Sequence, residues 1–437
     1  MNPCVVIGAG PMGLCTVRRL LEQGLNVIGL EAHGDVGGLW DIDSPTSTMY
    51  ESAHLISSKR MTEFADFPMA DEVATYPRHD ELKRYFQNYA KHFDLKRHYR
   101  FNSYVERIEP ASDSSSESGW LVRYRTASGT TEELHASAVL LANGTLHHPN
   151  RATFRGTFQG EMLHSCDYRS ADIFADKRVL IVGCGNSGCD IAVDAVHRAK
   201  SVDMAVRRGY YFLPKFIGGR ATDTLGGKIK LPLRIKQFVD GLLVRLISGK
   251  PSSYGLPDPD YRMYESHPVI NSLFLHHIGH GDIKVRPAID SLNEHGATFV
   301  DGTSASYDMI LQATGYKLHY PFIDKAHLNW NGHAPQLYLN IFSPSQPTLF
   351  VMGMVEAAGL GWQGRDDQAQ LVAKVIRQQQ DNPNAARRFQ AKVAQQAGQR
   401  LDGGMDYLEL ERMAYYVHKD TYLKALAKEM QQLGRGS

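Results

Sequence analysis

Two glycine-rich turns, each between a strand-like run and a helix-like run, constrain this chain more than any other feature. The more central one spans residues 177–193 and reads KRVLIVGCGNSGCDIAV. Its branched apolar run is typical of a strand buried on both faces. Its glycines Gly183, Gly185 and Gly188 have G-x-G-x-x-G spacing, which allows a tight turn, close backbone approach to a pyrophosphate and close helix–strand packing. The following helix offers unpaired N–H groups and a positive dipole end to the phosphates. The stretch therefore predicts a dinucleotide site.

The residue after the next predicted strand indicates which dinucleotide binds. An acid about 20 residues past the first glycine accepts from the ribose 2′-hydroxyl of NAD, whereas an arginine accommodates the 2′-phosphate of NADP. This chain carries Arg207 there, and the neighbouring Arg208 can share the contact. We therefore predict an NADPH site, with NAD as the less favoured alternative.

The chain begins with a second unit of the same form. Residues 5–14, VVIGAGPMGL, place Gly8, Gly10 and Gly13 after a strand-like run. The next predicted strand ends on Glu31, whose carboxylate can accept from both ribose hydroxyls of an adenosine. With 39 glycines in 437 residues, three fixed glycines match by chance about 0.3 times in the chain. One match is weak evidence, but two matches in the right context predict two nucleotide-binding domains.

Composition sets the outer limits of the interpretation. A length of 437 residues, with 43% hydrophobic and 22% charged residues, suits a globular protein with two large cores. The net charge of +1 gives no case for a nucleic-acid partner. No apolar run has the length of a membrane span, and the N-terminus lacks the features of a signal peptide. The five cysteines show neither C-x-x-C pairing nor metal-ligand spacing. This pattern favours reduced thiols in the cytoplasm and no metal site.

Further motifs lie between and after the two units. Gly37-Gly38-Leu39-Trp40 follows Glu31, and its glycine pair lets the backbone approach a bound dinucleotide, an ordinary turn being the alternative. Phe158, Gly160, His164 and Tyr168 then form the pattern F-x-G-x-x-x-H-x-x-x-Y. With the GNSG stretch at 185–188, Arg207-Arg208-Gly209 and the ATGY stretch at 313–316, these motifs resemble the flavin-containing monooxygenases, which are class B flavoprotein monooxygenases. The likeness covers roughly residues 1 to 375. Baeyer–Villiger enzymes are similar but usually end the pattern on tryptophan, so Tyr168 favours the first group.

The resemblance implies an α/β fold of two Rossmann-like dinucleotide-binding domains, with the NADPH domain inserted into a discontinuous FAD domain. We expect the FAD-binding domain at 1–150 and 331–437, the second part including a helical C-terminal extension, and the NADP-binding domain at 151–330. The residues expected to bind FAD are Gly8, Gly10, Gly13, Glu31, Gly38, Leu39, Trp40 and Gln363, the last at the start of a helix that should face the polar edge of the flavin. Those expected to bind NADPH are Gly183, Gly185, Asn186, Ser187, Gly188, Arg207 and Arg208.

The resemblance also implies the chemistry. In the family, NADPH reduces FAD, O₂ adds to form a C4a-peroxyflavin, and one oxygen passes to a soft nucleophile, sulfur or nitrogen, of a small molecule. Baeyer–Villiger oxygenation of a ketone is the alternative within the family. A largely uncoupled NADPH oxidase and an NADP-sensing flavoprotein without activity are the alternatives outside it. No motif identifies a catalytic residue or a substrate, and a homodimer remains an open alternative.

One position departs from the family pattern. The loop beside the flavin corresponds to residues 50–68, and Ser58-Lys59 and Asp66-Phe67-Pro68 look like that loop. Flavin-containing monooxygenases usually carry Thr-Asn just ahead of the Ser-Lys pair, with the asparagine over the flavin, where this chain has Leu55-Ile56. Isoleucine cannot donate a hydrogen bond. His54 and Ser57 are weak substitutes, and a structural role is the more common one for a lone histidine.

Periodicity supplies the remaining expectations. Residues 79–93 predict an amphipathic helix whose aromatic stripe belongs to the core. Residues 228–250 predict a basic amphipathic helix, either at a membrane surface or, preferably, over the substrate entrance or a partner subunit. The serine-rich loop at 111–119 should be solvated. From residue 382 onward the chain is polar and helical, and we expect a solvated extension.

Overall fold

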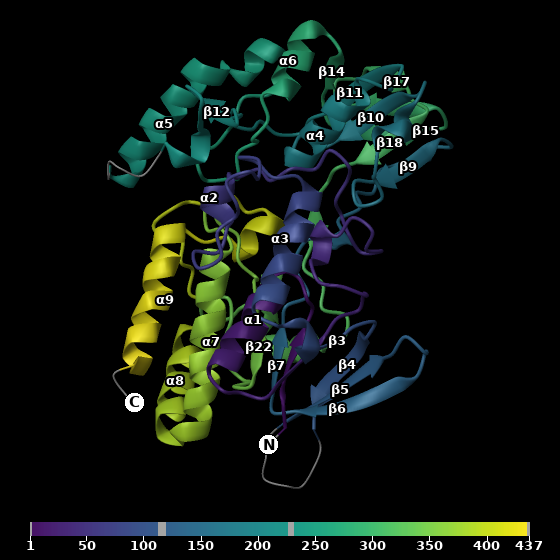
Figure 1. Cartoon of the computed structure of the whole chain (residues 1–437). Helices are drawn as coiled ribbons and strands as arrows, with labels where there is room; N and C mark the ends of the chain where they lie inside the picture. The colour runs from purple at the N-terminus through teal and green to yellow at the C-terminus, as the bar shows by residue number, and fades with distance from the viewer. Residues whose placement is uncertain (1, 112–118, 226–230, 435–437) are drawn as a thin grey trace.

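The computed structural model describes residues 2–111, 119–225 and 231–434. The chain forms two lobes, each around a parallel five-stranded sheet (Figure 1). The sheet of the first lobe has the order β22-β7-β1-β2-β3, and that of the second lobe has the order β14-β11-β10-β18-β9. Every strand of the second sheet lies between β7 and β22 in the sequence. The predicted α/β class, with one Rossmann-like domain inserted into another, is confirmed.

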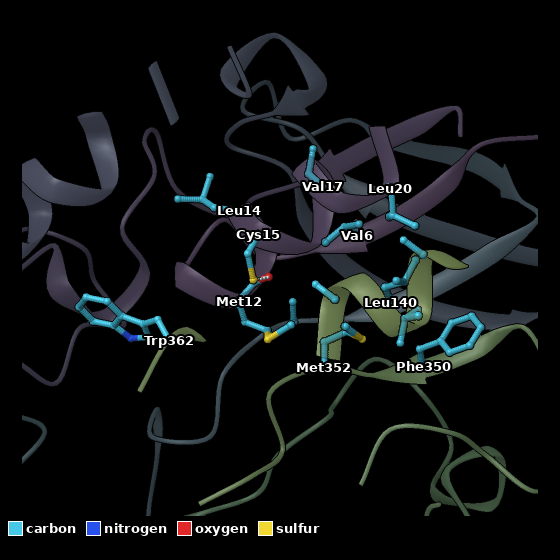
Figure 2. Close-up of a cluster of buried hydrophobic side chains, with 14 of the residues drawn as sticks. Val6, Met12, Leu14, Cys15, Val17, Leu20, Leu140, Phe350, Met352 and Trp362 are labelled. Carbon is cyan, nitrogen blue, oxygen red and sulfur yellow. Dashed lines mark hydrogen bonds between the residues drawn. The ribbon is translucent and has the colours of Figure 1, made fainter. Parts of the chain in front are cut away.

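The first lobe packs a helical layer on one face of its sheet and a small antiparallel sheet on the other. Side chains alternate along a strand. Cys4 and Val6 therefore share a core with residues of the helices α1 and α7, where Figure 2 shows Val6 near Leu20. Val5 and Ile7 share a core with Ile108 and Trp120 of the antiparallel sheet. The elements are β1 (Cys4–Ile7), α1 (Pro11–Glu22), β2 (Val27–Leu30), β3 (Tyr99–Arg100), β4 (Tyr104–Pro110), β5 (Trp120–Arg125), β6 (Thr131–Ala136), β7 (Ala138–Leu141), β22 (Leu349–Val351) and α7 (Gln363–Asp381).

The second lobe repeats the plan. Its central strand β10 pairs in parallel with β11 and β18, and α4 follows β10 as α1 follows β1. Its sheet and helices are β9 (Glu161–His164), β10 (Arg178–Val182), α4 (Asn186–Ala195), β11 (Ser201–Ala205), α6 (Leu273–His280), β14 (Ile283–Arg286) and β18 (Met309–Gln312). An antiparallel sheet of β15 (Ile289–Asn293), β16 (Gly296–Phe299) and β17 (Ser304–Ser306) packs on its other face.

The two connections between the lobes run side by side. The outgoing strand β8 (His148–Pro149) pairs with the returning strand β19 (Tyr316–Lys317) in antiparallel register. Residues 318–328 already pack in the core of the first lobe, and Ile108 N donates to Phe322 O at 2.6 Å. The boundaries 1–150, 151–330 and 331–437 remain predictions, and we propose that the return lies nearer residue 318 than residue 330.

The predictions for the segments 79–93 and 228–250 both gave helices, but the helices differ in how they are covered. The helix α3 (His79–His92) forms, and its stripe of Tyr85, Phe86 and Tyr89 is buried in the core as expected. The helix α5 (Leu233–Ser248) forms within the predicted 228–250 segment, of which 226–230 lie outside the described residues. Its Phe238 and Leu246 are 72% and 73% exposed, so the described part of this chain does not cover that face. A position over the substrate entrance or a partner subunit stays the prediction, with a membrane surface as the alternative.

The expectation of a solvated C-terminal extension was wrong. Helices α8 (Pro383–Gln396) and α9 (Lys419–Gly434) carry apolar stripes that pack against α7 and the core of the first lobe. Tyr422 is fully buried, and its hydroxyl donates to Leu339 O at 2.9 Å. Gln, Lys and Arg dominate the composition, but they occupy the outer faces of these helices and conceal the stripes.

Short elements complete the described chain. They are η1 (Gly38–Trp40), α2 (Lys59–Thr62), η2 (Lys96–His98), η3 (Ala171–Phe174), β12 (Phe216–Ile217), β13 (Arg220–Ala221), η4 (Thr222–Thr224), η5 (Pro251–Tyr254), η6 (Lys325–Leu328), β20 (Trp330–Asn331), β21 (Ala334–Pro335) and η7 (Glu411–Tyr415). Residues 112–118 of the serine-rich loop lie outside the described residues. Within the described ranges, no helix combines the length and the apolar character needed to cross a bilayer.

Candidate cofactor sites

The two glycine turns have nearly identical backbones. Gly8 and Gly183 adopt φ of +106° and +105°, a region that side chains rarely enter. A Cβ on Gly13 would lie 1.9 Å from Gly8 O, and a Cβ on Gly188 would lie 2.0 Å from Gly183 O. The first and third glycines therefore serve the turn and the close packing of helix on strand.

The middle glycines leave room for a ligand. Gly10 and Gly185 are the extended N-caps of α1 and α4, and neither helix has a side chain capping its first turn. A Cβ on Gly185 would meet nothing within 4 Å, and one on Gly10 only Gly38 Cα at 3.6 Å. Because the N–H groups of a first helical turn lack intrahelical partners, both turns fit a pyrophosphate.

The first candidate site continues through Gly38 and Glu31. Gly38 has φ of +58°, and a Cβ there would lie 2.9 Å from Gly10 Cα, so the two backbones touch beside the turn. The Glu31 carboxylate lies at the end of β2 and accepts from Ala9 N at 2.6 Å and His33 N at 2.9 Å. Burial raises the pKa of Glu31, and these backbone donors oppose the rise. A carboxylate offers about four lone-pair sites, so acceptor capacity remains for ribose hydroxyls.

The other residues predicted to bind FAD lie in η1 and at the start of α7. Leu39 and Trp40 are half-buried in η1, and the rings of Trp40 and Trp362 meet edge to face at 6.4 Å. Gln363, the first residue of α7, accepts from Ala65 N at 2.8 Å and donates to Asp367 Oδ1 at 2.9 Å. The structure thus places Gln363 against the residues after α2. Its contact with a flavin stays a prediction.

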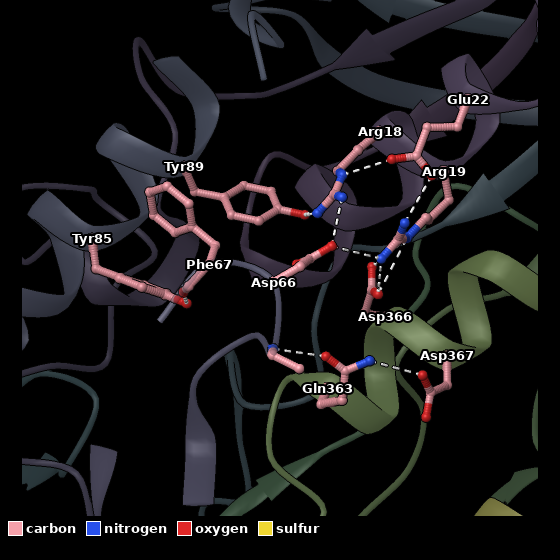
Figure 3. A network of polar contacts seen from close by, with 11 residues as sticks. Arg18, Arg19, Glu22, Asp66, Phe67, Tyr85, Tyr89, Gln363, Asp366 and Asp367 are labelled. Atoms are coloured by element: carbon pink, nitrogen blue, oxygen red, sulfur yellow. Dashed lines mark hydrogen bonds and ion pairs between the residues drawn. The ribbon is translucent and has the colours of Figure 1, made fainter. Parts of the chain in front are cut away.

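A network of charges ties three elements of the first lobe together (Figure 3). Arg18 donates to Asp66 Oδ2 at 2.6 Å and to Tyr89 OH at 3.2 Å. Arg19 donates to Asp366 Oδ1 at 2.9 Å and also reaches Asp66 at 3.2 Å. The Asp366 side chain is 2% exposed, and burial raises its pKa while Arg19 opposes the rise. The network therefore fixes α1, the loop around Asp66 and the start of α7 relative to one another.

In the second candidate site, the side chain of Asn186 does not face the expected cofactor. The Asn186 side chain accepts from Ile270 N at 2.8 Å and donates to Pro268 O at 3.3 Å. It therefore holds the segment before α6, leaving its backbone for the cofactor. Ser187 follows in the first turn of α4 and is half-buried.

Arg207 and Arg208 lie at the same edge of the second sheet as the glycine turn. Gly183 N donates to Ala205 O at 3.1 Å, which places the end of β11 beside the turn. Arg207 is exposed, and among the described residues it has no carboxylate within ion-pair distance. Arg208 lies 3.5 Å from Asp260. Two cations with one nearby acid fit an anionic 2′-phosphate, and Arg207 is the less encumbered.

The F-x-G-x-x-x-H-x-x-x-Y motif builds a corner at the edge strand β9. A Cβ on Gly160 would lie 2.8 Å from Asp308 O. His164 is fully buried, its Nδ1 accepts from Cys166 N at 3.1 Å, and burial lowers its pKa to about 4. The Tyr168 hydroxyl donates to Asp194 Oδ2 at 2.8 Å. The motif residues are therefore structural within the described protein.

The loop that carries the departure from the family pattern lies between the lobes. Leu55 is buried in the core of the first lobe, and Ile56 is half-buried. His54 is exposed, with Nδ1 2.7 Å from Ser52 O. Ser57 Oγ lies 2.7 Å from Thr62 Oγ1. Both candidate substitutes for the missing asparagine thus have partners within the loop.

Sequence reasoning missed the side chains that join this loop to the second lobe. Asp190 and Asp194 of α4 accept from Tyr50 and Ser52 respectively, and Asp223 accepts from Ser58 N. The sequence shows that Asp190 and Asp194 are four residues apart and so lie on one face of a helix. No motif indicated that their partners, or that of Asp223, lie more than a hundred residues away.

The fold and the two glycine turns define a class, the proteins with one Rossmann-like dinucleotide domain inserted in another. The flavin-binding monooxygenase-like family matches this chain over residues 2–430. Flavin-containing monooxygenase 3 of Rattus norvegicus is 32% identical over 394 residues, which are 85% of this chain and 73% of that protein. The chain belongs to the flavin-binding monooxygenase-like family and is an NADPH- and FAD-dependent monooxygenase.

Two solved structures share the fold. The S-allyl-L-cysteine S-oxygenase of Allium sativum has a TM-score of 0.66 and 20% identity, with 98% of this chain and 88% of that chain covered. The open structure of cyclohexanone monooxygenase has a TM-score of 0.74 and 17% identity, with 99% and 98% covered. Both likenesses concern the fold alone.

Proposed function

We propose that this monooxygenase oxygenates the sulfur or nitrogen of a small molecule. When bound, FAD accepts a hydride from NADPH and then activates O₂ so that one oxygen atom passes to the substrate. The observation that carries the substrate class is the likeness to flavin-containing monooxygenases along 85% of the chain, together with a signature that ends on Tyr168. The S-allyl-L-cysteine S-oxygenase of Allium sativum shares the fold, so the fold is compatible with oxygenation of sulfur.

The described residues fit both cofactors. For FAD, the cradle consists of Gly8, Gly10, Gly13, Glu31 and Gly38, with Leu39, Trp40 and Gln363 as the proposed wall. For NADPH, it consists of Gly183, Gly185, Asn186, Ser187 and Gly188, with Arg207 and Arg208 for the 2′-phosphate. The physical basis is the pair of uncapped helix starts at glycines where a Cβ would meet little or nothing.

The residues that stand near the proposed flavin face, His54, Ile56 and Ser57, leave no obvious side-chain donor for the flavin. Ile56 offers no donor, while His54 and Ser57 have their own partners. Dryness protects a reactive oxygenating centre from hydrolysis and proton leakage. We therefore propose that the enzyme oxygenates substrates yet releases more hydrogen peroxide than a relative with asparagine at this position.

A substrate panel tests the proposal. Purified holoenzyme is given NADPH with thioethers, tertiary amines or cyclic ketones, and NADPH consumption, product and hydrogen peroxide are measured together. We expect sulfoxide or N-oxide, with less peroxide per NADPH in the presence of those substrates. Lactone formation from the ketones alone would instead support the second candidate, Baeyer–Villiger oxygenation, with which the fold shared with cyclohexanone monooxygenase is compatible. Peroxide equal to NADPH with every compound would indicate an oxidase.

A further inference from the structure

The segment 49–58 connects the cores of the two lobes. Tyr50 and Ala53 are 6% and 4% exposed, and they belong to the core of the second lobe, where the Tyr50 ring lies 5.3 Å from that of Tyr168. Leu55, two residues past Ala53, packs in the core of the first lobe. A segment that belongs to the first lobe in the sequence therefore has apolar anchors in both.

Polar contacts hold the beginning of this segment to α4. The Tyr50 hydroxyl donates to Asp190 Oδ2 at 3.3 Å, and Ser52 Oγ donates to Asp194 Oδ2. The Tyr168 hydroxyl donates to that same Asp194 oxygen at 2.8 Å. Burial raises the pKa of both tyrosines, so both remain protonated donors at neutral pH.

A third carboxylate of the second lobe holds the end of the segment. Asp223 Oδ2 accepts from Ser58 N at 2.6 Å. Nearby, Tyr76 of the first lobe donates to Lys215 O, and its ring meets Phe216 edge to face at 5.2 Å. In the sequence, Ile56 thus lies between Ser52 and Ser58, which both form hydrogen bonds to the second lobe.

The carboxylates that bind Tyr50 and Ser52 belong to α4, and the start of this helix is the proposed NADPH site. α4 starts at Asn186, directly after Gly185. Asp190 and Asp194 are four residues apart, so they project from one face of this helix. A shift of α4 when a dinucleotide binds or leaves would therefore be transmitted to Ser52 and, through the short chain that follows, to Ile56.

We propose that Asp190, Asp194 and Asp223 are positioning residues that hold the flavin-side loop 50–58 to the NADPH-binding lobe, so that bound nucleotide keeps Ile56 in place and limits peroxide release. The inference rests on the proposed function, because it assumes that this loop lies beside the flavin. The three carboxylates touch neither substrate nor cofactor in this account. They act through the loop.

Amide hydrogen exchange tests the mechanical part without turnover. The FAD-bound protein is compared with and without NADP⁺, and exchange is followed in peptides that cover 49–58. In the wild type, NADP⁺ should slow exchange in this segment. In Ser52→Ala and Asp194→Ala that slowing should shrink roughly three- to tenfold, the range expected for one hydrogen bond. Ser52→Thr, which keeps the hydroxyl, should behave as the wild type, and Asp172→Asn, at an exposed ion pair of the same lobe, should be silent.

Coupling tests the functional part. Ser52→Ala should raise peroxide released per NADPH by a few fold at saturating NADPH, with the KM for NADPH unchanged within about twofold because the start of α4 is intact. The double variant Ser52→Ala/Asp194→Ala should release no more peroxide than Asp194→Ala, because Asp194→Ala has already removed the only contact that Ser52→Ala is meant to break. A purely structural role would lower stability without this pattern.

The outcomes separate the inference from the function on which it rests. Equal NADP⁺ protection of 49–58 in the wild type, Ser52→Thr and Ser52→Ala would overturn the inference, whatever the substrate panel shows. Additive peroxide release in the double variant would overturn it as well. If the panel yields no oxygenated product while the exchange pattern holds, the proposed function fails and the mechanical link between nucleotide and loop stands.

Discussion

Single residues decide which atoms can approach each cofactor. The two glycine turns use the same three backbone positions, and only at the middle one, Gly10 or Gly185, would a Cβ avoid a close contact. The two candidate sites differ in charge: Glu31 follows the first turn, whereas Arg207 follows the second. Substitutions at these positions should therefore affect one cofactor at a time.

Gly10→Ala should yield protein that is colourless or nearly so. The new methyl group would lie 3.6 Å from Gly38 Cα, an ordinary contact, so the fold tolerates it and the loss comes from the space of the pyrophosphate. The measurement is the ratio of flavin absorbance to protein after purification. Gly241→Ala, on α5 with nothing within 4 Å, is the matched control. A yellow Gly10→Ala with full FAD would show that the site is misplaced.

Arg207→Ala should raise the KM for NADPH far more than that for NADH, because only NADPH carries the 2′-phosphate. The loss of one charge-assisted hydrogen bond corresponds to about 1.5–3 kcal/mol. Arg208→Ala should have a smaller effect because Asp260 lies 3.5 Å from Arg208. The measurement is steady-state kinetics with both nucleotides. Equal weakening of both, or a wild type that prefers NADH, contradicts the assignment.

Ile56→Asn tests whether hydrogen bonding or dryness governs the loop. An amide there supplies a donor and an acceptor, and one hydrogen bond is worth roughly 0.5–1.5 kcal/mol net. Ile56 is half-buried, and we expect the amide to slow peroxide release without substrate about three- to tenfold. Ile56→Val serves as the apolar control. Faster release from the asparagine variant would mean that exclusion of water matters more than the hydrogen bond.

Whole elements show what sequence can and cannot predict. The strands and helices of both glycine units, and the aromatic face of α3, follow from local periodicity and turn chemistry, which the fold reinforces. The stripes of α8 and α9 were hidden because the polar residues around them dominate the composition. The hydrogen bond from Ser52 to Asp194 of α4 joins residues with no shared periodicity. Asp66 was recognised only as part of a motif. Its partners Arg18 and Arg19 depend on tertiary packing.

Arg19→Met should destabilise the holoenzyme by about 3–5 kcal/mol, because it leaves the Asp366 carboxylate buried without its partner. The measurement is urea unfolding followed by far-UV circular dichroism. Arg19→Met/Asp366→Leu, which removes both charges, should recover much of the loss. Lys177→Met, at an exposed pair with Glu161, should change stability by less than about 1 kcal/mol. An equal effect of Arg19→Met and Lys177→Met would show that the network contributes little.

At the scale of the whole molecule, the buried histidines His147 and His164 should each contribute a loss of stability as pH falls from about 6.5 toward 4. Burial lowers the pKa of His164 and His147 to about 4, below the ordinary value for histidine. In this window the unfolded chain binds protons that the folded chain does not, so unfolding becomes easier as pH falls, by about 1.4 kcal/mol per pH unit for each such histidine.

His164→Asn should reduce that slope by the share of one histidine, since asparagine can accept from Cys166 N but does not titrate. Urea unfolding at several pH values measures the slope. His295→Asn, at an exposed turn, should leave the slope unchanged. An unaltered slope in His164→Asn would mean that the buried imidazole is not the proton-linked group.

The insertion of one sheet into another also sets the order in which the molecule can assemble during synthesis. All five strands of the second sheet lie within residues 161–312, and Tyr50 and Ala53, which complete its core, have left the ribosome by then. The first sheet still lacks β22, and its core lacks Leu371, Val372 and Ile376 of α7. The N-terminal part of the first lobe therefore cannot complete its sheet and core until the C-terminal part has been synthesised. The second lobe, which lies between these parts in the sequence, can already form its own core.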